Sequence, residues 1–107
     1  MPSSKSYLEF VLDQLSGLDG VSWRAMMGEY ILYYRDKIVG GVYDDRFLVK
    51  QTASSAAMMP DAVKEPPYDG AKEMLLVDRL DDRQFLEGLL TAMADELPAA
   101  KKRKQSG

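Results

Sequence analysis

The chain has 107 residues, the size of one compact domain, and 46% of them are hydrophobic, so we expect a folded core. It contains neither cysteine nor histidine. The absence of cysteine excludes disulfides, thiolate catalysis and cysteine metal sites, and the absence of histidine removes the usual general base and the commonest metal ligand. We therefore expect a protein that is not an enzyme and that holds no metal and no cofactor.

The charge balance is acidic: 14 Lys and Arg residues against 17 Asp and Glu residues give a net charge of −3. A non-specific nucleic-acid binder is normally basic overall, so this balance argues against that function. The sequence has no apolar run of about 18 residues that would span a membrane, and no apolar segment behind a basic start. These features predict a cytoplasmic protein.

The first predicted element is a helix over residues 4–16. Ser6 and Glu9 have the spacing of a capping box. Apolar residues then recur at helical spacing, namely Leu8, Val11, Leu12, Leu15 and Leu18. Gly17 and Gly20 permit the left-handed backbone with which many helices end.

Residues 21–50 are dense in β-branched and aromatic side chains, with turn signals at Arg35-Asp36 and Asp44-Asp45. This pattern predicts an antiparallel meander. Its strands are expected at 22–27, 30–35, 37–43 and 46–50. Both faces of the second strand are apolar, so this strand is either covered on both sides or meets a partner. For the glycine pair at 40–41 in the third strand, we favour a β-bulge over a ligand contact.

After residue 50 the pattern predicts a short helix that begins behind Thr52 and ends at Pro60, and then a loop over 61–71. A fifth strand follows at 73–78. The last helix is capped by Asp81 or Asp82 and carries apolar residues at helical spacing up to Leu97. The expected fold is a two-layer α+β domain over residues 1–98, with an antiparallel sheet of about five strands and both terminal helices on one face. A disordered basic tail is expected over 99–107.

Three side-chain features have both a structural and a functional interpretation. Asp44-Asp45 and Asp81-Asp82 are paired carboxylates, but acid–base catalysis needs two carboxyls in unlike environments across a cleft, so we interpret the pairs as a hairpin turn and a helix start. The methionine pairs Met26-Met27 and Met58-Met59 fit either the core or an adaptable binding surface. Arg24 fits either a solvated strand position or a contact with an aromatic ring or a carboxylate.

The ordered features from residue 21 onward resemble the N-terminal domain of the TfoX/Sxy family of competence regulators. The resemblance rests on Val21 to Gly28 with Arg24, Met26 and Met27, on Tyr30, Tyr33 and Asp36-Lys37, on Asp45 to Lys50, and on Pro67-Tyr68. It extends over residues 8–97, with Met27 where the family usually has phenylalanine. The resemblance implies a two-layer α+β fold and a role in transcriptional control of DNA uptake through protein contacts, and it brings no catalytic residues.

These observations predict a non-enzymatic regulatory or adaptor module that binds a protein partner, with the transcription machinery as one candidate. The expected contact residues are Arg24, Met26, Met27, Gly28, Tyr33 and Lys50. Homodimerisation through the open sheet face or an edge strand is a further expectation.

Two alternatives stay open. The first is weak nucleic-acid binding through Lys101, Lys102, Arg103 and Lys104, helped by basic strand residues, although we favour a solubilising terminus as the explanation of this cluster. The second is a small-ligand site formed by Tyr68 and the loop 61–71.

Overall fold

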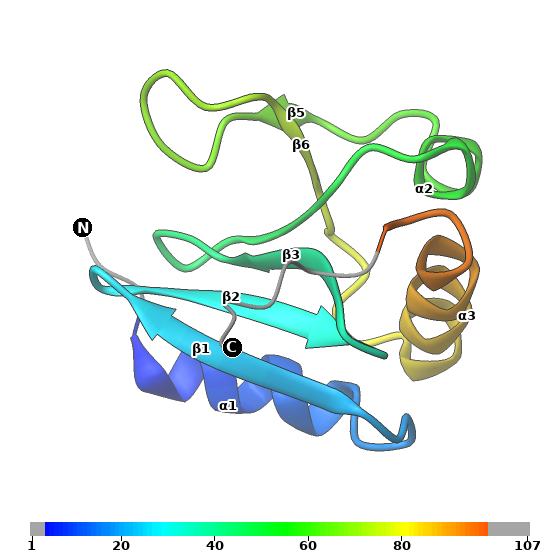
Figure 1. Ribbon diagram of the computed structural model, residues 1–107, viewed down its shortest axis with the longest axis horizontal. Helices are drawn as coiled ribbons and strands as arrows, with labels where there is room; N and C mark the ends of the chain where they lie inside the picture. Colours follow the sequence, from blue (N-terminus) through cyan, green and yellow to red (C-terminus); the bar gives the residue numbers. More distant parts are fainter. Residues whose placement is uncertain (1–3, 99–107) are drawn as a thin grey trace.

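The computed structural model describes residues 4–98 and shows an α+β fold, as the sequence predicts (Figure 1). The elements are α1 (Lys5–Gln14), β1 (Val21–Met26), β2 (Glu29–Tyr34), β3 (Lys37–Val42), β4 (Phe47–Val49), α2 (Ala53–Met58), β5 (Lys64–Glu65), β6 (Met74–Leu76) and α3 (Arg83–Ala94). The sheet is antiparallel, in the order β1-β2-β3-β4-β6-β5. The predicted tail at 99–107 lies outside the described residues.

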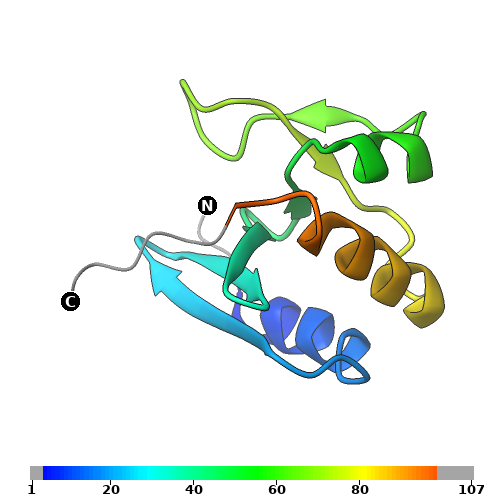
Figure 2. The same cartoon turned by 45° about the vertical axis from the view of Figure 1, so that its right-hand side comes forward.

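The helices share one face of the sheet, where they bury a single apolar core. Leu8 of α1, Leu15 just after α1 and Leu89 of α3 are fully buried in one cluster with Leu32 of β2 and Phe47 of β4. Figure 2 shows α2 and α3 packed side by side on this layer. No helix within residues 4–98 is long and apolar enough to cross a membrane.

Three tight hairpins form the first four strands. Each hairpin has two central residues, and all six of these residues have positive φ angles: Met27 (54°) and Gly28 (85°), Arg35 (54°) and Asp36 (63°), and Asp44 (54°) and Asp45 (56°). Positive φ at both positions defines the type I′ turn, whose twist matches that of the flanking strands. The turns therefore fix the register of the meander, and the predicted role of Asp44-Asp45 as a hairpin turn is confirmed.

The interpretation of the glycine pair as part of a bulge is also confirmed. Leu32 lies opposite Gly40 while Tyr33 lies opposite Ile38, so Val39 is the extra residue on β3. The backbone of β4 lies close to Gly40, where an added Cβ would be 2.8 Å from the Cα of Val49. Glycine at this position therefore allows close approach of the two strands.

Several local predictions need correction. The N-cap of α1 is Ser4, not Ser6, because the Ser4 hydroxyl accepts the Tyr7 N–H. The prediction that Asp81 or Asp82 caps α3 is confirmed, and the cap is Asp82, whose carboxylate accepts the Phe85 N–H. The sheet has six strands because β5 forms inside the predicted loop 61–71, where Lys64 pairs with Leu75 of β6. A two-residue strand has no periodicity to detect, and it exists only through that pairing.

Candidate protein-binding surface

The sheet face opposite the helices carries a row of residues from five strands. Directly paired residues of an antiparallel sheet point to the same side, and the pairings place Arg24, Ile31, Gly41, Leu48 and Leu76 in one row. We call this side the open face. The three helices of residues 4–98 all contribute to the core on the other side, so none of them covers the row.

Tyr43 occupies the middle of the open face. Its side chain is 7% exposed, packs with Leu48 and Met74, and lies over Gly41. Burial raises the pKa of the Tyr43 phenol, and the neighbouring Tyr68, Glu29 and Tyr33 raise this pKa further. This part of the face is therefore closed by an aromatic side chain, with Leu48 and Met74 buried against it.

The turn between β1 and β2 projects apolar side chains into solvent. We call Met26, Met27 and Gly28 the hairpin tip. Met27 is 95% exposed with a left-handed backbone, and Met26 is 46% exposed. A non-glycine residue costs free energy in this conformation, and a large exposed apolar side chain adds nothing to the core. The tip therefore combines an unfavourable backbone conformation at Met27 with exposed methionine side chains, and the fold of this chain requires neither.

Polar contacts hold the base of the hairpin tip. The Glu29 carboxylate accepts the backbone N–H of Asp44 at 3.0 Å, which ties the β1–β2 turn to the β3–β4 turn. In the same region the Asp45 carboxylate accepts the backbone N–H of Ser4 at 2.8 Å, at the start of α1. Figure 1 shows both turns and the start of α1 at one end of the molecule. The tip is therefore supported by a polar network and presents its methionines outward.

The structure separates the residues that the sequence predicts as one contact surface. Met26, Met27 and Gly28 form the tip, and Arg24 is exposed on the open face of the same hairpin. Tyr33 is half-buried on that face, farther along β2. Lys50 follows β4 at the end of the sheet opposite the tip, since the β1–β2 and β3–β4 turns share one end. The β1–β2 hairpin is thus the one element that gathers most of them.

Sequence reasoning overlooked Trp23. This residue is 41% exposed on β1 and its ring meets that of Tyr30 edge to face, with 5.5 Å between centroids. Tryptophan in a strand usually indicates a core position, and only the knowledge that β1 is an edge strand reveals its exposure. Because Trp23 pairs with the buried Leu32, its ring lies on the helix side of β1, at the edge of the sheet, and not on the open face with Met26.

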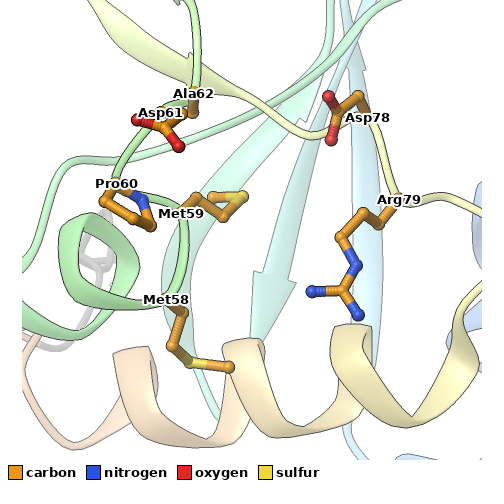
Figure 3. Close-up of a pocket in the computed structure, with 7 residues that line it drawn as sticks. All are labelled: Met58, Met59, Pro60, Asp61, Ala62, Asp78 and Arg79. Carbon is orange, nitrogen blue, oxygen red and sulfur yellow. The ribbon is translucent and has the colours of Figure 1, made fainter.

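A small pocket of about 140 Å³ lies on the helix side, below the β6–α3 connection (Figure 3). It is lined by Met58, Met59, Pro60, Asp61, Ala62, Asp78 and Arg79. Figure 3 shows Asp61 and Asp78 on its two sides, with the Arg79 guanidinium directed toward α3. That guanidinium is already engaged, because it donates to Asp82 at 2.7 Å and lies over the Phe85 ring.

The pocket overlaps the predicted small-ligand site only in part, through Asp61 and Ala62 of the loop 61–71. Tyr68 does not line it and is 63% exposed in the β5–β6 loop. Met59 is 9% exposed and belongs to the core cluster, with Met58 packed against it. Within residues 4–98, no group of three or more Asp and Glu side chains is placed to hold a metal ion. Of the two methionine pairs, only Met26-Met27 therefore has both side chains largely exposed to solvent.

Comparison with known proteins gives one informative similarity. The chain is 35% identical, over 105 residues, to a protein of Spirochaeta aurantia described as "Uncharacterized 12.7 kDa protein in trpE 5'region". The aligned region covers 97% of this chain and 91% of that protein. No family model matches the chain, and no solved structure matches it. The similarity therefore extends over nearly the whole of both proteins.

Proposed function

The chain belongs to the same family as the uncharacterised 12.7 kDa protein of Spirochaeta aurantia, and we propose that it is a non-enzymatic adaptor or regulatory module that binds another protein. The partner would contact the β1–β2 hairpin, with the hairpin tip as the central element. The resemblance to TfoX/Sxy proteins points to transcriptional control, and to the transcription machinery as the class of partner. The compartment that we propose is the cytoplasm.

The observation that carries this proposal is Met27. Its side chain is 95% exposed and its backbone has a φ of 54°, a conformation for which asparagine and glycine are far better suited. Unfavourable backbone conformations cost roughly 1–3 kcal/mol each and gather at functional positions. Methionine is also typical of adaptable binding surfaces, because its unbranched side chain fits different partners. Contact with an apolar pocket on a partner explains both the residue and its exposure.

The neighbouring side chains extend this contact. Met26 is 46% exposed beside Met27, and Arg24 is exposed on the same face of β1 as Met26. Methionine and arginine side chains are among the types enriched at protein interfaces. The surface is small, so we expect a transient complex and not a permanent assembly.

The test is capture of partners from native lysate by three tagged proteins: the wild type, Met27→Asn and Asp36→Gly. Both substitutions place a residue suited to positive φ in a type I′ turn, but Asp36 lies at the opposite end of the sheet. We expect the wild type and Asp36→Gly to retain one stoichiometric protein in the presence of nuclease, and Met27→Asn to lose it.

Other outcomes would overturn the proposal. Equal capture by Met27→Asn would remove the hairpin tip from the contact surface. Partners that disappear after nuclease treatment would shift the assignment to nucleic-acid binding, which falls steeply with salt. Titration of the identified partner into each purified variant then measures the change in affinity, for which we expect at least a tenfold loss, about 1.4 kcal/mol, in Met27→Asn.

A further inference from the structure

The outer edge of β1 is unprotected. β1 ends the sheet, and within residues 4–98 it pairs with β2 alone. Proteins usually protect edge strands with proline, several charges, a bulge or a short length. β1 has six residues, no proline and one charged side chain, Arg24, and five of its residues are exposed. The opposite edge, β5, has only two residues. The outer edge of β1 can therefore pair with a strand of another molecule.

The ladder with β2 identifies which backbone groups of β1 face outward. The turn closes on the pair Met26–Glu29, and the N–H of Arg35 donates to the carbonyl of Gly20 at 3.3 Å. Bonded and non-bonded pairs alternate in an antiparallel ladder, so the even-numbered residues of β1 bond to β2. The N–H and C=O groups of Val21, Trp23 and Ala25 consequently point away from the sheet.

The outward N–H and C=O groups can form hydrogen bonds with the same groups of β1 in a second copy of the protein. When Trp23 lies opposite Trp23 of a second copy, Val21 lies opposite Ala25 in both directions, and all three outward residues of each strand are bonded. Arg24 then lies opposite Ser22 of the second copy. A shift that centres the pairing on Arg24 places two like charges opposite each other, which is unfavourable.

Space for this arrangement exists on the helix side of β1. Leu32, the β2 residue opposite Trp23, is fully buried under the helices, whereas Trp23 itself is 41% exposed. The helices thus cover β2 and leave the side chain of Trp23 accessible at the edge. A second Trp23 across the dyad would cover this ring, and buried tryptophans are frequent at the energetic centre of interfaces.

We propose that the protein forms a symmetric dimer in which the β1 strands of two copies pair antiparallel, centred on Trp23, into one continuous sheet. The arrangement is a closed, self-complementary interface of the kind that homodimers use. It depends on the strand edge and not on the hairpin tip, so it stands or falls independently of the adaptor function. The hairpin tips of the two copies remain free for partners.

The first measurement is the mass of the purified full chain by analytical ultracentrifugation between about 1 µM and about 500 µM, the range in which weak dimers dissociate. We expect the mass to rise from 12.0 kDa to twice that value. The emission of Trp23, the single tryptophan, should shift to the blue over the same range as its ring leaves water. A mass of 12.0 kDa at every concentration would overturn the proposal.

Two pairs of variants test the geometry. Ala25→Pro removes an N–H that points outward, at a position where an edge strand tolerates proline. We therefore expect this variant to be folded by circular dichroism and monomeric by ultracentrifugation. Its control, Ala25→Val, keeps the N–H and should dimerise like the wild type. Dimerisation by Ala25→Pro would exclude this edge.

Ser22→Glu tests the register. It places a carboxylate opposite Arg24 twice, which we expect to tighten the dimer roughly threefold to tenfold at low salt, whereas the uncharged Ser22→Gln should have little effect. Equal dissociation constants for both variants would exclude the pairing centred on Trp23. Partner capture through Met27 is measured separately, so a monomeric protein that still binds its partner would overturn the dimer alone.

Discussion

The ring of Tyr43 lies directly on Gly41, and this contact closes the centre of the open face. A Cβ at position 41 would lie 2.7 Å from Cε2 of Tyr43 and 2.5 Å from the carbonyl oxygen of Tyr30. The Tyr30 carbonyl belongs to the β2 backbone, so it cannot shift away from an added Cβ without disturbing the strand. Gly41 is therefore required for its small size, since it allows the strand and the ring to approach closely.

This relationship predicts that Gly41→Ala lowers the free energy of unfolding by about 1–3 kcal/mol, as overpacking usually does. Gly88→Ala is the matched control. Gly88 lies in α3, where an added Cβ would come no closer than 3.9 Å to Met58 Cε, so the change should stabilise the protein by about 0.5–1 kcal/mol. Urea denaturation of the two variants measures both values, and equal effects would contradict the packing argument.

The type I′ turns predict gains in stability. Asp36 has a φ of 63°, and Met27 has a φ of 54°. Asp36→Gly should raise the free energy of unfolding by about 0.5–1 kcal/mol, and Met27→Asn by a similar amount, because each relieves an unfavourable backbone conformation. Chemical denaturation provides the measurement. A loss of stability in either variant would show that the side chain contributes more to folding than its backbone costs.

Together with the capture experiment, these variants separate folding from function. Met27→Asn is expected to be more stable and to lose the partner, whereas Asp36→Gly is expected to be more stable and to keep it. Opposite changes in stability and binding are typical of residues retained for function at a cost to the fold.

A carboxylate contact between two helices predicts part of the response to acid. Glu96, just after α3, accepts the hydroxyl of Ser54 at 2.6 Å and its backbone N–H at 3.0 Å, which links α3 to the start of α2. These hydrogen bonds, with the hydroxyl bond as the largest cause, hold the pKa of Glu96 below its usual value of 4.5. The folded state therefore favours the ionised carboxylate.

The sign of the effect follows from the lowered pKa. The stabilisation is complete above the pKa of the unfolded chain, near 4.5, and is lost as the pH falls through the lower pKa of the folded protein. As the pH falls below 5, the melting temperature of Glu96→Gln should decrease less than that of the wild type. The decrease for Ser54→Ala should lie between those two. Glu9→Gln, exposed on α1, is the control that leaves this contact intact. Identical pH profiles for all four proteins would contradict the assignment.

The strands that follow one another in the sheet were the most predictable part of the fold. β1 to β4 pair with their neighbours in sequence through turns of two residues, so the alternation of apolar side chains and turn residues in 21–50 was sufficient. β5 was not predictable, because its two residues become a strand only by pairing with β6, which returns from beyond a loop to lie between β4 and β5.

The candidate surface was predictable only in part. The sequence indicated that Met26-Met27 and Met58-Met59 were each either core or interface, but burial depends on which elements pack above a residue. The helix layer covers Met59 and leaves Met27 in solvent. Similarly, Lys50 and the hairpin tip share the sheet but lie at its two ends, a separation that follows from strand direction and not from residue type.

By itself, the sequence determined the local structure of this protein: the amphipathic helices, the positions of two hairpin turns and the absence of cysteine and histidine chemistry. These properties depend on residues close together in the chain, whose spacing is visible without a fold. Only the tertiary structure decided that β1 lies at an edge with Trp23 exposed, and that Met27 projects beyond the core. Strand order and exposure arise from contacts between distant segments, and the same residues would be buried if another strand lay beside β1.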